Sequence, residues 1–113
     1  MPGARASVAG SGTATVGAIL PLSGLFSTLG PPELDAMQMA IEAINSGGGF
    51  KVAGKQHTIA VKVLDDESAP ATVGISDYRQ LVEVDHVSVP VLADNTRIYA
   101  AQVRRASLPV LSP

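Results

Sequence analysis

Long apolar runs alternate along the chain with segments in which apolar residues recur at helical spacing. The first run, Thr15 to Leu22, is almost continuously apolar and closes at Ser23-Gly24, which predicts a strand buried on both faces. Beyond Gly30 the spacing predicts an amphipathic helix, whose apolar stripe contains Leu34, Met37, Ile41 and Ile44. This helix ends at Ser46 and the three glycines that follow it.

The middle of the chain predicts a second strand and a second helix. We interpret Phe50 to Gln56 as a polar turn, and the alternating Ile- and Val-rich segment His57 to Leu64 as the strand. Pro70 suits the first position of a helix because its missing N–H is not needed there. Three apolar residues of this helix share one face: Ile75, Tyr78 and Val82.

Two more strands and one helix complete the pattern. His86 to Leu92 predicts a third strand and Leu108 to Leu111 a fourth, with a helix capped by Asp94 or Asn95 between them. Strands that alternate with helices over short connections form parallel sheets with right-handed crossovers. We therefore expect an α/β fold: an open parallel sheet in strand order 2-1-3-4, with helices on both faces and the most apolar strand at the centre.

Composition limits the possible functions. The length allows one small domain, which we place at residues 15–113 after a flexible segment at 1–14. A net charge of −2 and 4% aromatic residues give no reason to expect nucleic acid. Absence of cysteine excludes a disulfide or a thiolate metal site in this chain. The N-terminus lacks the apolar run of about 7–15 residues of a signal peptide, and we expect none in this chain.

Four motifs in order carry a resemblance to a known family. They are GAILPLSG (17–24), AIEAINSGGG (40–49), LDDESAP (64–70) and LPVLSP (108–113). In this order and at this spacing, they resemble the type I periplasmic binding proteins of branched-chain amino acid ABC transporters (the Leu/Ile/Val-binding group). The resemblance covers roughly residues 16–113, and it implies that the chain is part of the N-terminal lobe of a two-lobed protein.

The resemblance implies a binding function and no catalysis. Such a protein reversibly binds an amino acid or other small carboxylate between its lobes and delivers it to an ABC permease in the membrane, without a cofactor or metal. The second lobe would complete the site. The full-length protein would be periplasmic, or extracellular and anchored by a lipid.

The candidate binding residues form two groups along the chain. Ser23 and Gly24 can present a hydroxyl and an accessible backbone N–H to a ligand, with Phe26 as an apolar wall. The other group lies at a predicted helix N-terminus, where free N–H groups favour an anion. It comprises Ala93, Asp94, Asn95 and Thr96. The resemblance implies small hydroxyl residues near the start of this predicted helix, where this chain has Leu92 and Ala93. It also places at Ser68 and Leu92 the positions of a disulfide found in some members.

A different class of protein remains an alternative. Asp65 and Asp66 follow the second strand, and paired carboxylates can bind Mg²⁺ in a small flavodoxin- or receiver-like signalling or enzyme domain. A solvated strand end or a capping role is the simpler interpretation of these residues. His57 and His86 lack a partner at a recognisable spacing, so we interpret them as surface or edge residues.

We expect the chain to form a homodimer. In the family the region after the fourth strand is covered by later segments, so the Leu108–Pro113 strand and the helix near Val103 would keep apolar surface that a symmetric dimer can bury. Light scattering at micromolar concentration should give about twice the chain mass of 11.5 kDa. A monomer with little exposed apolar surface would contradict this prediction.

Overall fold

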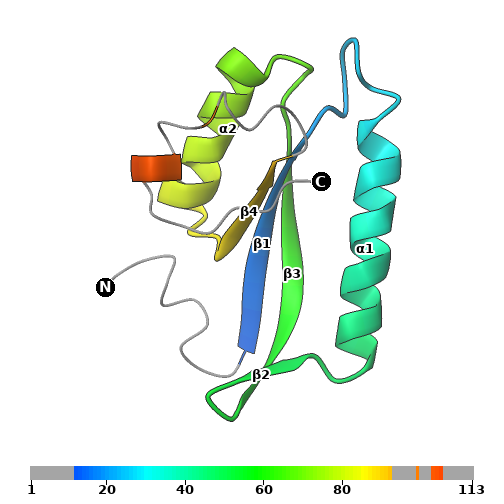
Figure 1. Cartoon of the computed structure of the whole chain (residues 1–113), viewed down its shortest axis with the longest axis vertical. Helices are drawn as coiled ribbons and strands as arrows, with labels where there is room; N and C mark the ends of the chain where they lie inside the picture. Colours follow the sequence, from blue (N-terminus) through cyan, green and yellow to red (C-terminus); the bar gives the residue numbers. More distant parts are fainter. Residues whose placement is uncertain (1–11, 93–98, 100–102, 106–113) are drawn as a thin grey trace.

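A four-stranded sheet forms the centre of the molecule (Figure 1). The computed structural model describes residues 12–92, 99 and 103–105. The strands lie in the order β2-β3-β1-β4, and β1 pairs in parallel with both β3 and β4. Their bounds are β1 Gly12–Leu20, β2 Phe50–Val52, β3 Lys55–Asp65 and β4 Val89–Leu92.

Helices cover the two faces of this sheet. The long helix α1 (Gly30–Ser46) lies on one side, and a second helical segment lies on the other (Figure 1). The second segment consists of η2 (Pro70–Gly74), α2 (Ile75–Arg79) and η3 (Gln80–Val84), and η2 and η3 are π-helical turns. None of the helices within the described ranges is long and apolar enough to cross a membrane.

The predicted arrangement of the first three strands is confirmed. They correspond to β1, β3 and β4, and β1 lies between the other two as expected for the most apolar strand. β1 begins at Gly12, three residues before the predicted start. The predicted fourth strand, Leu108 to Leu111, lies outside the described residues. So does most of the third helix, of which Val103 to Arg105 is described and helical.

The segment predicted as a polar turn contains an additional strand. β2 pairs antiparallel with the start of β3 around Ala53 and Gly54, which both have positive φ. The sheet is therefore mixed, and the interpretation of Phe50 to Gln56 as a turn alone was wrong. The Phe50 ring stacks on His57 at a centroid distance of 5.5 Å, and His57 is only 1% exposed. His57 is thus a buried packing residue and not the surface residue expected.

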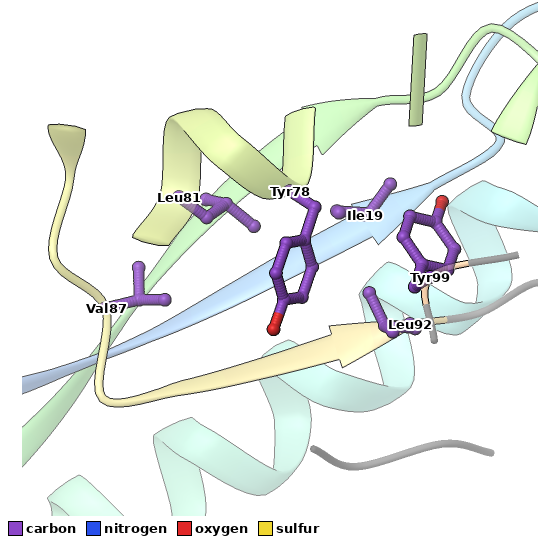
Figure 2. Packing of buried hydrophobic residues seen from close by; sticks show 6 residues of the cluster. All are labelled: Ile19, Tyr78, Leu81, Val87, Leu92 and Tyr99. Atoms are coloured by element: carbon purple, nitrogen blue, oxygen red, sulfur yellow. The ribbon is translucent and has the colours of Figure 1, made fainter. Parts of the chain in front are cut away.

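The hydrophobic core lies between the sheet and the second helical segment. Figure 2 shows side chains from β1, β4 and this segment converging on one another. Tyr78 is buried as predicted, and Ile75 and Val82 pack against its cluster. Six residues form the cluster: Ile19, Tyr78, Leu81, Val87, Leu92 and Tyr99. This contact fixes the second helical segment, and hence the loop that precedes it, relative to the carboxyl ends of the strands.

Gly17 allows this helix to approach the centre of β1. A Cβ atom at this position would lie 2.8 Å from Leu81 Cδ1 and 3.1 Å from Val87 Cγ1. These side chains are buried and closely packed, so they have little room to move. Glycine is therefore required in the middle of this strand by packing.

Gly17→Ala should destabilise the chain by about 1–3 kcal/mol, because the added methyl group overpacks the core. Urea unfolding followed by circular dichroism measures this loss. Gly47→Ala is the matched control: Gly47 has φ −81 and its added Cβ would make only ordinary contacts at 3.6 Å. Equal stability of the Gly17→Ala variant and the wild type would contradict the packing argument.

Candidate ligand-binding site

The parallel pairing of β1 brings two loops together at one edge of the sheet. Leu20, the last residue of β1, pairs with Asp65, the last residue of β3. The first loop (residues 21–29) therefore begins beside the second loop (residues 66–69). In open α/β folds, ligands bind at this carboxyl edge of the sheet. The sequence predicted this location from the order of its strands and helices.

The Asp65 carboxylate ties the first loop to the end of β3. Its Oδ1 accepts hydrogen bonds from the backbone N–H groups of Leu22 (3.0 Å), Ser23 (3.2 Å) and Glu67 (2.7 Å). Its Oδ2 accepts one from the Ser23 hydroxyl at 2.6 Å. Burial alone would raise the pKa of Asp65, but these hydrogen bonds favour the ionised form and lower its pKa below the ordinary value.

The Ser68 hydroxyl makes a second connection between the two loops. It donates a hydrogen bond to the backbone oxygen of Ser23 (2.7 Å) and accepts one from the backbone N–H of Phe26 (2.9 Å). One hydroxyl group thereby joins both sides of the turn that carries Gly24 and Leu25. Asp65 and Ser68 together are called the loop anchor below.

The second loop has an uncommon backbone conformation. Glu67 and Ser68 have φ values of 56° and 58°, a left-handed conformation that costs energy for residues other than glycine. Their N–H groups donate to Asp65 and Asp66 at 2.7 Å and 2.8 Å, which compensates part of this cost. Gly24 packs against this backbone: with φ +84, an added Cβ would lie 2.6 Å from the Glu67 carbonyl oxygen.

The anchored first loop presents apolar side chains to solvent. Leu25, Phe26 and Leu29 are 85%, 45% and 55% exposed. Their positions follow from the hydrogen bonds that hold the backbone of residues 22, 23 and 26. The exposed surface of this loop is therefore suited to contact the apolar part of a small molecule.

The structure brings together three of the predicted binding residues. Ser23, Gly24 and Phe26 lie on the first loop, as expected, although the Ser23 hydroxyl donates to Asp65 and Gly24 is packed against Glu67. The other four lie outside the described residues: Ala93, Asp94, Asn95 and Thr96. Leu92, which precedes them, is buried in the core.

The acidic residues after β3 organise the loops. Asp65 accepts four hydrogen bonds from the protein, and Asp66 is fully buried with Oδ1 accepting from Ser68. Within the described part of the chain, no group of three or more His, Asp or Glu residues is placed to hold a metal ion. Neither carboxylate caps the helical segment at Pro70, whose N-cap residue Ala69 receives no side-chain hydrogen bond, and Asp66 is buried and not solvated. The expected helix-capping or solvated role was therefore wrong, and the contacts of these carboxylates are with the backbone and Ser23 of the two loops.

Sequence reasoning missed one ionisable group near this edge. Asp77 on α2 has a pKa raised to about 6, first because burial disfavours its charge and then because Asp65 and Glu67 repel it. One of its carboxylate oxygens is buried without a hydrogen-bond partner. The helical spacing of α2 cannot reveal the raised pKa of Asp77, because the carboxylates that repel it, Asp65 and Glu67, lie at the end of β3 and in the second loop.

Residues 13–113 match the periplasmic binding protein family, and the chain belongs to this family. The fold is the half-lobe of its type I members.

Solved structures show the same fold. The branched-chain amino acid transporter substrate-binding protein LivJ from Streptococcus pneumoniae, in complex with isoleucine, is 31% identical over 89% of this chain and 28% of its own, with a TM-score of 0.75. An ABC transporter substrate-binding protein from Aeropyrum pernix has a TM-score of 0.79 at 21% identity, over 90% of this chain and 27% of its own.

A structure with a lower TM-score carries a different ligand. A solute-binding protein of an ABC transporter from Rhodopseudomonas palustris, in complex with 4-hydroxybenzoate, is 24% identical over 88% of this chain and 26% of its own, with a TM-score of 0.66. The present chain thus spans about a quarter of the length of these proteins.

Asp77→Asn should stabilise the chain at pH 7 by about 1 kcal/mol. This free energy is smaller than the shift of the Asp77 pKa alone would imply, because the carboxyl is partly exposed and solvent screens its charge. A carboxyl whose pKa is raised on folding binds its proton more tightly in the folded chain. The free energy of unfolding therefore falls as pH rises from the ordinary pKa of 3.8 to about 6. The gain should disappear at pH 4, where Asp77 is protonated in the folded chain.

Urea unfolding at pH 4 and pH 7 tests this expectation. Asp35→Asn, an exposed position on α1, is the control and should show no such gain at pH 7. Equal stabilisation by Asp77→Asn at both pH values would show that the charge of Asp77 is not the cause.

Proposed function

We propose that this chain contributes one wall of the ligand cleft of an ABC-importer substrate-binding protein, which reversibly binds an amino acid or other small carboxylate. The observation that carries the proposal is the anchored first loop with its exposed Phe26 at the carboxyl ends of the parallel strands β1 and β3. Membership of the periplasmic binding protein family supports the same conclusion.

The exposed side chains favour a ligand with an apolar body. Leu25, Phe26 and Leu29 offer apolar surface, which contributes roughly 25 cal/mol for each Å² removed from water. Isoleucine and 4-hydroxybenzoate, which occupy two of the similar structures, both combine such a body with a carboxylate. We propose that the carboxylate meets the backbone near Gly24, or the helix start predicted at Ala93 to Thr96.

The proposed mechanism is closure of two lobes around the ligand, followed by docking of the closed form on a membrane permease. Each lobe covers part of the ligand, so affinity depends on both. The similar structures are a little more than three times as long as this chain, because 89% and 90% of it cover only 28% and 27% of theirs, which leaves room for a second lobe in a protein of their size. We place the working protein in the periplasm or, with a lipid anchor, outside the cell.

We expect this chain alone to bind leucine, phenylalanine or 4-hydroxybenzoate no more tightly than about millimolar, because one wall buries much less of a ligand than a complete pocket does. Titration followed by amide chemical shifts should move the signals of Ser23 to Phe26. Isothermal calorimetry should give no micromolar constant.

Phe26→Ala should weaken this binding severalfold through the loss of apolar contact. Met39→Ala removes an even more exposed apolar side chain from α1, far from the first loop in sequence, and should not change it. Absence of any shift in the first loop at high millimolar concentrations of all three compounds would overturn the proposed function.

A further inference from the structure

We propose that Asp65 and Ser68 are positioning residues of the binding site, which hold the first loop so that Phe26 is presented to the ligand. The inference rests on the proposed function, and it assigns a role in binding to two side chains that need not touch the ligand. Its basis is the geometry of the loop anchor.

The first loop needs an external support because of what it exposes. Leu25 and Phe26 place large apolar side chains in water, and a free loop would lower its energy by folding them onto the protein. Hydrogen bonds within the loop join Ser27 to Gly24 and Leu29 to Phe26, and they give the turn its shape. The bonds to Asp65 and Ser68 are different because they fix this turn to the end of β3.

The chemistry of Ser68 suits this task. Its hydroxyl donates to one backbone group of the loop and accepts from another, so it needs both functions at once. Alanine has neither function. The left-handed φ of 58° at this position also disfavours a β-branched residue such as threonine.

The chemistry of Asp65 is equally specific. An ionised carboxylate only accepts hydrogen bonds, and all four of its partners here are donors. Asparagine keeps the size and one acceptor oxygen, but its amide nitrogen cannot accept from the Ser23 hydroxyl. Asp65→Asn therefore removes one of the bonds to the first loop and weakens the others with little change in volume.

The backbone strain of the second loop fits the same role. Glu67 and Ser68 adopt consecutive left-handed conformations, which bring the Ser68 hydroxyl to the first loop. Strained residues of this kind persist where the surrounding structure enforces them, and they concentrate at binding sites. A loop ordered before the ligand arrives loses less entropy on binding, which increases affinity.

Amide hydrogen exchange and ligand titration of the 113-residue chain test the inference together. Ser68→Ala should accelerate exchange of the Phe26 amide by about tenfold, and should weaken binding of leucine or 4-hydroxybenzoate by about fivefold. Asp65→Asn should have the same effects, with faster exchange at Ser23. Amides of the core, such as Leu81, should be unaffected. Ser76→Ala on α2 and Asp35→Asn on α1 are the matched controls.

The pH dependence of the loop provides a signature specific to Asp65. The pKa of Asp65 is lowered on folding. Its contribution to the stability of the folded chain is therefore complete at pH values above the ordinary pKa of 3.8, and it is lost as the pH falls through the lower pKa of the folded chain. Intrinsic amide exchange also varies with pH, so rates are compared as protection factors. Protection of Ser23 in the wild type should fall in this acid range, and in Asp65→Asn it should be low throughout.

The outcomes separate this inference from the proposed function. Unchanged exchange of the first loop in both variants would overturn the inference and leave the function standing. Faster exchange with unchanged affinity would also overturn it, because the anchor would then be structural only. If the wild type binds neither compound, the proposed function fails and the role in binding fails with it, whereas the anchoring of the loop is still decided by exchange.

Discussion

The parallel pairing of β1 with two neighbours determines where everything else in this chain lies. β1 matches β3 from Gly12–His57 to Leu20–Asp65, and its second edge matches β4 through Ile19 and Leu92. All three strands therefore end at the same edge of the sheet. The loops that leave β1 and β3 meet there, although they are more than forty residues apart in the sequence. Without this register, Asp65 could not reach the backbone of Leu22 and Ser23.

The elements that the sequence predicted well are those with a strong local signal. β1 was expected at the centre because only a strand with neighbours on both edges and helices on both faces tolerates continuous apolar residues. The start of the second helical segment at Pro70 follows from the backbone chemistry of proline. The β2 hairpin was missed because its strand has only three residues, Phe50 to Val52, and because the stacking of Phe50 on His57 is a contact between two strands that the pattern of one strand does not show. A short strand with a lysine at its centre has no periodicity to detect.

The candidate site was predicted in location and only partly in detail. Topology alone placed Ser23, Gly24 and Phe26 at the carboxyl edge of the sheet. What the Ser23 hydroxyl does there could not be predicted, because its partner Asp65 is 42 residues away. The same holds for Ser68, which the sequence showed only as a residue of the LDDESAP motif, at the position of a disulfide in some family members. Gly24 was expected to leave its backbone accessible, and the structure adds a second reason for glycine: contact with Glu67 excludes a side chain.

Several locally unfavourable features lie together at this edge of the molecule. Glu67 and Ser68 have left-handed backbones, Leu25 and Phe26 expose apolar surface, and the carboxyl of Asp77 lies near two others that raise its pKa. Features of the same kinds occur elsewhere in the described residues: Ala53 and His86 are left-handed, Val84 is exposed, and His57 Nε2 is buried without a hydrogen-bond partner. At the carboxyl edge, by contrast, the strained Ser68 itself bonds the loop that exposes Phe26, so strain and exposed apolar surface belong to one arrangement. This combination, at the edge where open α/β folds bind ligands, supports this edge as the site.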